Sequence, residues 1–310
     1  MTLTQLRTFL AIAETGSVHA AADRLFITQS AVSASLTSLQ KSLGLRLLER
    51  DGRGVRLTDA GKVYAHYVRG VLGLLDEGRN AASAESDPER GELRIAAVTT
   101  AGERILPWIL ADFRAQHPRM GISMEVGNRD RVRRLLERHE VDLVLGGRPD
   151  YEREVTVLAV RPHELIVVAP PEAPPTEQGT PTWLRRATWL LREPESGTRA
   201  VTETFLAGLD LGAAPRTLTM GSNTAMRESV AAGLGITLIS RDAVARELAD
   251  GRLVEVPVPG APLARDWHLV ANPGRLPATA AMLTAHILGT GNFHAPAQPE
   301  PPGDEHPPGA

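Results

Sequence analysis

The chain contains no cysteine, which excludes a disulfide framework, a thiolate zinc site and a cysteine nucleophile. Its first residues lack the basic stretch and apolar run of a signal peptide, and no apolar run is long enough to span a membrane, so we expect a cytoplasmic protein. The nine histidines are scattered without the spacing of metal ligands. Nucleophile-elbow, dinucleotide, P-loop and zinc-protease motifs are also missing, so we expect no metal, no cofactor and no catalytic activity.

The residues that are present are typical of a globular protein with a sizeable core. Apolar residues make up 42% and charged residues 23% of the 310 residues, a length that suggests two domains. The net charge of -3 excludes a uniformly basic nucleic-acid binder. Residues 1–60 nevertheless hold seven Lys and Arg against five Asp and Glu, so positive charge is concentrated in this segment.

The stretch 17–43 predicts two short helices joined by a tight turn. Ser17 and Thr28 are good N-cap residues, and apolar residues of the second helix recur at intervals of four, three and four. The opposite side of that helix is small, rich in hydroxyls and nearly free of carboxylates, which suits contacts to phosphates and base edges in a major groove. This pattern predicts a helix-turn-helix, although an ordinary solvated helix is the alternative. The candidate DNA contacts are Thr28, Gln29, Ser30, Ser33, Ala34 and Thr37.

Two short strand-like runs, 46–50 and 55–57, flank an Asp-Gly turn and predict a β-hairpin, or wing. Arg50, Arg53 and Arg56 could reach phosphates or a minor groove from this hairpin. The alternative is an arginine-rich surface hairpin without a ligand.

A long helix over 58–86 should follow, opened by the capping hydroxyl of Thr58. Its apolar residues step by four, three, four and three, which is heptad spacing. The helix could therefore pair with a second copy in a dimer, or pack on its own domain. The apolar positions are Ala60, Tyr64, Tyr67, Val71 and Leu74.

From residue 92 onward, strands and helices alternate, which predicts an α/β domain over 91–290 with mostly parallel sheets. Two separate strands are expected at 155–160 and 165–169. The final residues, 294–310, are rich in Pro, Gly and acids and are expected to be a disordered tail.

Several loops of this domain should converge at the carboxyl ends of its strands, where α/β sheets bind ligands. Free N–H groups at the helix starts, with neighbouring hydroxyls and arginines, would suit a phosphate or carboxylate. The alternative is that the hydroxyls only cap helices and the arginines are ordinary surface residues. The candidate ligand contacts are Thr99, Thr100, Arg148, Ser196, Gly197, Thr198, Arg199 and Asn223.

Ordered motifs in the first 61 residues resemble the winged helix-turn-helix of LysR-type transcriptional regulators. They include Thr28-Gln29-Ser30-Ala31-Val32-Ser33, Leu47-Leu48-Glu49-Arg50 and Leu57-Thr58-Asp59-Ala60-Gly61. Two departures from the family pattern are Ser30, where Pro is usual, and the small pair Ala34 and Ser35, where longer side chains often read bases. This helix should therefore make few base contacts, and more of the sequence specificity should come from DNA shape.

The resemblance extends over about residues 1–290 and implies an α+β multi-domain protein. The implied parts are the winged domain at 1–60, the linker helix at 58–86 and a C-terminal domain similar to periplasmic binding proteins. Subdomain I would cover 91–161 and 268–290, and subdomain II 162–267, with an effector in the cleft between them. Implied partners are double-stranded promoter DNA, a small anionic metabolite, further copies in a homodimer or homotetramer, and RNA polymerase.

Motifs of the C-terminal half, such as Gly127-Asn128-Arg129 and Met220-Gly221-Ser222-Asn223, are similar to the LysR-type regulators of CO2-fixation operons. That similarity implies a phosphorylated or carboxylated effector. The expected function is therefore a metabolite-controlled transcriptional regulator. Two alternatives stay open, namely a solute-binding protein or cleft enzyme with an accessory DNA-binding-like domain, and an architectural DNA-binding protein that needs no effector.

Overall fold

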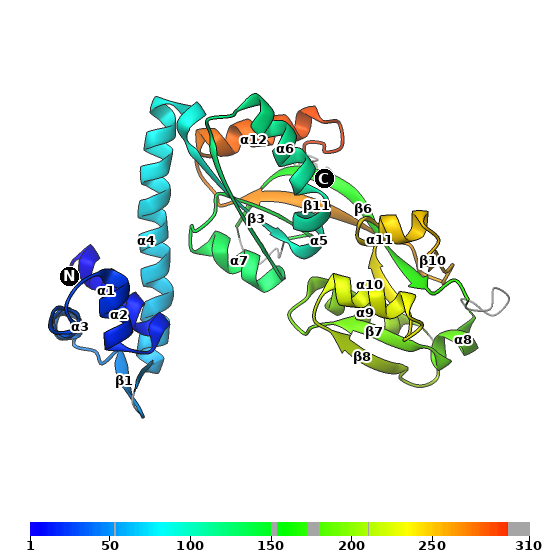
Figure 1. Cartoon of the computed structure of the whole chain (residues 1–310), viewed down its shortest axis with the longest axis horizontal. Coiled ribbons are helices and arrows are strands. Elements are labelled where there is room, and N and C mark those ends of the chain that lie inside the picture. Colours follow the sequence, from blue (N-terminus) through cyan, green and yellow to red (C-terminus); the bar gives the residue numbers. More distant parts are fainter. Residues whose placement is uncertain (53, 150–153, 173–179, 210, 297–310) are drawn as a thin grey trace, which may run out of the picture. The chain divides into compact units, whose positions relative to one another are not determined.

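A computed structural model describes residues 1–52, 54–149, 154–172, 180–209 and 211–296. The chain divides into two compact units (Figure 1). The N-terminal unit comprises Met1–Ser83 with Glu137–Glu140, and the C-terminal unit comprises Ala84–Leu136 with Val141–Ala310. Among the described residues, no helix combines the length and hydropathy needed to cross a bilayer.

The N-terminal unit contains three short helices, a two-stranded hairpin and a long helix. In chain order these are α1 (Leu3–Thr15), α2 (Val18–Leu25), α3 (Gln29–Leu43), β1 (Leu48–Asp51), β2 (Gly54–Leu57) and the start of α4 (Asp59–Ser86). The Ser17 and Thr28 hydroxyls accept backbone N–H groups at the starts of α2 and α3, as the sequence predicts. Phe9, Ile12 and Leu47 are fully buried in the core that holds these helices to the hairpin.

Gly61 lets α4 approach the strand side of this unit closely. A Cβ atom placed on Gly61 would lie only 1.9 Å from the backbone carbonyl oxygen of Leu47. That carbonyl also accepts the N–H of Thr58, so it is fixed in place.

We therefore expect Gly61→Ala to destabilise the N-terminal unit by about 3 kcal/mol, because backbone atoms would have to move apart. Circular dichroism melts of the full chain would measure the loss. Gly70→Ala is the matched control, since its Cβ would meet nothing within 4 Å, and it should stabilise α4 slightly. If Gly61→Ala and the unmodified chain melted at the same temperature, the close approach of α4 to the Leu47 carbonyl would be contradicted.

The C-terminal unit has two lobes. Lobe I contains β3 (Glu92–Val98), α5 (Thr99–Arg104), α6 (Leu106–Gln116), β4 (Gly121–Gly127), α7 (Arg129–Glu137), β5 (Leu143–Gly146) and α12 (Ala278–Gly289), preceded by the short η1 (Pro88–Arg90). Lobe II contains α8 (Pro181–Arg186), β7 (Thr188–Arg192), α9 (Gly197–Gly208), β8 (Arg216–Met220), α10 (Asn223–Ala231), β9 (Thr237–Ser240), α11 (Arg241–Ala249) and β10 (Val254–Glu255).

Two long strands, β6 (Thr156–Ala169) and β11 (Leu263–Ala271), run side by side from one lobe into the other (Figure 1). The main sheet has the order β10-β6-β11-β5-β3-β4, with β9 also paired to β6. Its β3 pairs are parallel, whereas β6 is antiparallel to β9, β10 and β11. The prediction that the strands are mostly parallel is therefore wrong for the part of the sheet around β6 and β11. A second sheet holds the parallel pair β7 and β8.

The prediction of two strands at 155–160 and 165–169 is also wrong, because β6 is continuous. Pro162 lies opposite Asp266 in the ladder and is exposed. Proline is tolerated where its missing N–H needs no ladder partner, and pairing with β11 on both sides of Pro162 keeps the strand extended.

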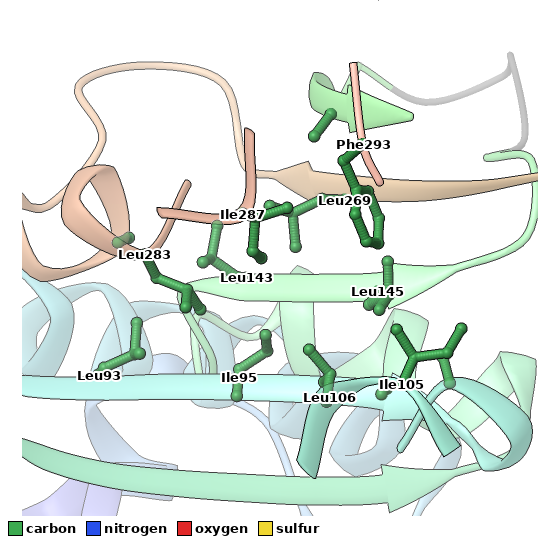
Figure 2. Packing of buried hydrophobic residues seen from close by; sticks show 14 of the residues in the cluster. Leu93, Ile95, Ile105, Leu106, Leu143, Leu145, Leu269, Leu283, Ile287 and Phe293 are labelled. Carbon is green, nitrogen blue, oxygen red and sulfur yellow. The ribbon is translucent and has the colours of Figure 1, made fainter. Parts of the chain in front are cut away.

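The core of lobe I holds its end of the crossover strands in place. Figure 2 shows leucine and isoleucine side chains of β3, β5 and α12 directed toward one another, with Leu269 of β11 and Phe293 among them. Lobe II has its own buried clusters around Trp189 and Ile166. Each lobe is thus a separate hydrophobic body, and the crossover strands connect them. Of the predicted tail, residues 297–310 lie outside the described residues.

Candidate functional site

The first candidate surface is the outer face of α3. Val32 and Leu39 are buried against α1, whereas the six predicted DNA contacts (Thr28, Gln29, Ser30, Ser33, Ala34 and Thr37) are all exposed. The Thr28 hydroxyl lies 2.9 Å from that of Ser30. The Gln29 Nε2 lies 2.8 Å from the Nδ1 of His19, a residue of α2 that sequence reasoning missed. These six residues are rich in hydroxyls and carry no charge, and Lys41 adds an exposed positive charge in the last turn of α3.

The hairpin beside α3 pairs Leu48 with Leu57 and Asp51 with Gly54. Arg50 and Arg56 are exposed on it, and the Arg56 guanidinium lies 2.6 Å from the Glu49 carboxylate. An exposed pair of this kind is weak, so Arg56 can exchange Glu49 for a phosphate at little cost. The third predicted wing residue, Arg53, lies outside the described residues.

Phe26 occupies the turn between α2 and α3 in a left-handed conformation, with φ of 55°, and is 95% exposed. A bulky residue is strained by about 1–2 kcal/mol in this conformation. Because the Phe26 side chain is almost fully exposed, its burial does not offset that strain.

We expect Phe26→Asn to stabilise the chain by about 1 kcal/mol, because Asn adopts this conformation more readily than Phe. Chemical denaturation would measure the change. Ile27→Asn is the control, since Ile27 is partly exposed next to Phe26 but does not have a positive φ. A loss of stability in Phe26→Asn would mean that the aromatic ring makes contacts that outweigh the backbone strain.

The second candidate site is a cavity of about 420 Å³ between the lobes of the C-terminal unit. Lobe I contributes the ends of β3, β4 and β5, lobe II contributes β7 and α9, and the crossover strands form one wall. Six of the predicted residues line this cavity: Thr99, Thr100, Arg148, Ser196, Gly197 and Thr198.

The prediction for Arg199 needs correction. Its guanidinium donates to the carboxylate of Glu203 at 2.8 Å and to the backbone carbonyl of Arg192 at 2.9 Å, and it does not line the cavity. Arg199 is the third residue of α9, so the helical rotation from Gly197 carries its side chain toward β7 and β8. It positions α9.

Asn223 also lies behind the cavity wall. Its amide donates to the Thr100 hydroxyl at 2.9 Å and its carbonyl accepts from the Arg192 guanidinium. A second bond between the lobes runs from the Asn128 amide to the Glu195 carboxylate at 2.9 Å. These bonds hold the lobes together next to the cavity without blocking it.

The cavity wall is strongly basic. Four arginines line it, namely Arg129, Arg148, Arg192 and Arg265, and its described lining contains neither Asp nor Glu. Arg265 forms no ion pair with any residue that the structure describes. Burial and the nearby charge of Arg129 lower the pKa of Arg265. Arg192 already donates to the Glu193 carboxylate at 2.8 Å, whereas the charge of Arg265 lacks a described counter-ion that an anion in the cavity would supply.

The crossover wall follows from strand geometry. Leu263, Arg265 and Trp267 alternate along β11, so their side chains share one face of the sheet. On β6, Leu165 lies opposite Leu263 and His163 opposite Arg265. No short-range motif or spacing in the sequence links these residues to the site.

His163 is held as a neutral ring in this wall. It stacks on the Trp267 indole with ring centroids 4.0 Å apart, and burial lowers its pKa to about 4. The nearby carboxylate of Asp242 opposes that shift, while Arg265 and Arg161 add to it.

A histidine whose pKa is lower in the folded chain costs stability when it must be protonated. We expect the free energy of unfolding to fall as the pH drops from about 6.5 towards 4, by at most about 3 kcal/mol from His163. Urea denaturation at several pH values would measure the slope. His163→Phe keeps an aromatic ring against Trp267 and should flatten this slope; an unchanged slope would show that other groups cause it.

Comparison with known proteins identifies matches for both units. Residues 3–62 match the family model described as bacterial regulatory helix-turn-helix protein, lysR family, and residues 86–290 match the LysR substrate binding domain. The chain is 35% identical over 284 residues to the RuBisCO operon transcriptional regulator of Allochromatium vinosum, covering 91% of this chain and 93% of the relative.

Two solved structures are similar as well. The LysR family regulator CbnR, in complex with its target DNA, is 21% identical with a TM-score of 0.67, covering 94% of this chain and 100% of CbnR. At that identity the likeness concerns the fold alone. The regulatory domain of Synechocystis PCC6803 CcmR, in complex with 2-PG, is 26% identical with a TM-score of 0.59, covering 65% of this chain and 98% of that domain.

Proposed function

Because the chain belongs to the LysR family of bacterial DNA-binding transcriptional regulators, we propose that a small anionic metabolite controls it by binding in the cleft between lobes I and II. The observation that carries the proposal is the cavity itself, which is lined by four arginines and no described carboxylate. Thr100, Ser196 and Thr198 add hydroxyl groups, and the N-terminus of α9 adds backbone N–H groups.

The ligand class that we propose is a phosphorylated or carboxylated metabolite. The relative in complex with 2-PG and the relative named for the RuBisCO operon make 2-PG the first compound to test. Arg265 and Arg129 would bind its anionic groups, and Arg148 and Arg192 would add further donors. We propose no catalytic role for the cleft and no cofactor.

The DNA contacts that we propose are those of α3 and the wing. Thr28, Gln29, Ser30, Ser33 and Thr37 would contact phosphates and base edges, with Ala34 packing against the groove. Arg50, Arg53 and Arg56 would contact the backbone or a minor groove. This role places the protein with the chromosome, in the cytoplasm.

Dimerisation is proposed through α4. Five large apolar residues are exposed on the helix in a single chain, namely Val63 at 61%, Tyr67 at 67%, Val71 at 49%, Leu74 at 53% and Leu75 at 47%. A second copy would cover them, and paired C-terminal units would extend the assembly to a tetramer. Two winged domains could then read two half-sites of a promoter and act on RNA polymerase.

In the proposed control mechanism, the ligand changes the separation of lobes I and II. A ligand that bridges Arg265 on the crossover wall and Ser196 on lobe II would favour one separation of the lobes over another, in competition with the bond between Asn223 and Thr100. The separation would set the spacing of the paired winged domains.

Two measurements test the proposal separately. Selection from a random DNA pool should enrich one roughly palindromic sequence, and Gln29→Ala with Ser33→Ala should weaken binding to it. A thermal-shift titration with 2-PG should raise the melting temperature of the full chain. Failure of the enrichment would reject sequence-specific DNA binding, whereas failure of 2-PG and of a panel of small phosphates and carboxylates would reject the anionic effector.

A further inference from the structure

Two buried polar atoms at the crossover end of the cleft make no hydrogen bond of normal geometry to any residue that the structure describes, although the Glu164 backbone acts to raise the pKa of His163. They are the Oγ of Ser240 and the Nδ1 of His163, and both residues line the cavity. Ser240 is only 3% exposed. Buried polar groups are nearly always paired, so two unpaired atoms on one cavity wall indicate a missing hydrogen-bonding partner.

The two atoms lie close together by strand register. Ser240 lies opposite Leu165 on β6, and His163 is two residues before Leu165, on the same face of that strand. On the other side of β6, Leu263 of β11 lies opposite Leu165, and Arg265 lies opposite His163. Ser240 and His163 therefore border one small region of the wall, next to the cationic part of the cavity.

Ser240 has no local role that would explain its hydroxyl. It occupies the N-cap position of α11, yet its side chain makes no capping hydrogen bond. Ser222, at the same position of α10, accepts the N–H of Ala225 at 3.1 Å. The difference leaves the Ser240 hydroxyl available to a ligand.

The surroundings favour a neutral group over a second anion. The Asp242 carboxylate interacts with His163, and it already accepts the Trp267 indole N–H at 3.0 Å and the Arg161 guanidinium at 3.1 Å. An anion placed beside it would be repelled. A hydroxyl group can donate to one of the unpaired atoms and accept from the other.

The cavity also has an apolar part. Leu165 and Leu263 of the wall face Val201 and Phe205 of α9. At about 420 Å³ the cavity falls within the usual range for small-molecule sites, and a bare three-carbon diacid would leave much of it empty.

We propose that the effector is a bifunctional acid, whose anionic group binds the arginines and whose neutral hydroxyl, carried on a short apolar body, binds Ser240 and His163. The inference rests on the proposed function, because it concerns the ligand of the same cleft. It predicts that Ser240 and His163 select among acids, while Arg265 binds all of them.

The test is isothermal titration calorimetry of the full chain with pairs of acids that differ by one hydroxyl. The pairs are benzoate and 4-hydroxybenzoate, pentanoate and 5-hydroxypentanoate, and butyl phosphate and 4-hydroxybutyl phosphate. In at least one pair, the hydroxylated acid should bind about 10-fold more tightly, because its partner leaves both buried atoms unpaired. Ser240→Ala should reduce that preference to about 3-fold or less and leave the affinity for the plain acid unchanged.

Control variants separate a lost contact from a damaged fold. Ser240→Ala should not lower the melting temperature, because no capping bond is lost, whereas Ser222→Ala should lower it by about 2–4 °C and keep the ligand preference. His163→Phe retains a ring beside Trp267 and should also lose the preference.

The outcomes distinguish the inference from the proposed function. If 2-PG binds and Arg265→Gln abolishes that binding, but no pair shows a preference or the preference survives in Ser240→Ala, the hydroxyl subsite is wrong and the anion-controlled regulator stands. If neither 2-PG nor any of the six acids binds, both are overturned.

Discussion

Arg265→Gln is expected to weaken binding of an anionic effector by at least about 30-fold while raising the stability of the free protein. The two effects have one cause. In the free chain the Arg265 guanidinium is partly buried, lies near Arg129 and pairs with no described carboxylate. Its charge is therefore unfavourable until an anion arrives.

Most substitutions of a binding residue reduce affinity and stability together or leave stability unchanged. A rise in melting temperature combined with a loss of affinity is the result expected for an uncompensated charge that is kept for a ligand. Calorimetric titration with 2-PG and a thermal melt of the free variant would measure both quantities on one protein preparation.

Arg199→Gln is the matched control and should show the opposite pattern. Its guanidinium is engaged with Glu203 and with the Arg192 carbonyl, so its loss should cost about 1–2 kcal/mol of stability. Because Arg199 does not line the cavity, effector affinity should change by less than about 3-fold. If both variants lost affinity equally, the assignment of Arg265 as the direct contact would be wrong.

The contrast between these two arginines shows what the sequence could and could not predict. Ser196, Gly197 and Thr198 line the cavity at the start of α9, and the sequence could place them there because a helix start is a local signal. Whether Arg199 faces the ligand depends on a rotation of about 100° per residue along the helix, and on the position of β7 and β8. That position is a property of the tertiary structure.

The crossover wall was missed for a related reason. His163 and Arg265 are far apart in the sequence, and only the antiparallel register of β6 and β11 places them opposite each other. The helix-turn-helix, in contrast, was predicted well, because the caps at Ser17 and Thr28 and the spacing of Val32 and Leu39 act within a few residues.

Asp142→Ala is expected to have the largest effect on stability, a loss of about 3–5 kcal/mol in the C-terminal unit. The Asp142 side chain is only 2% exposed and that of Arg94 only 11%. The carboxylate accepts the backbone N–H of Arg94 at 2.9 Å and its Nη2 at 2.5 Å. Alanine would remove this carboxylate from a largely buried cation and from a backbone N–H, and differential scanning calorimetry should show a melting temperature about 10 °C lower.

The double variant Arg94→Met with Asp142→Leu decides between two explanations of that loss. If the ion pair stabilises the unit through its own attraction, removing both partners should cost as much as removing one. If the cost arises from stranding one charge, the double variant should recover most of the stability, because a buried pair barely repays its desolvation. We expect the second result.

Asp142 precedes β5 and Arg94 lies near the start of β3, whereas the cleft lies at the far ends of these strands. The folded double variant should therefore bind 2-PG as the unmodified chain does, and a loss of binding would mean that the pair also positions the cleft.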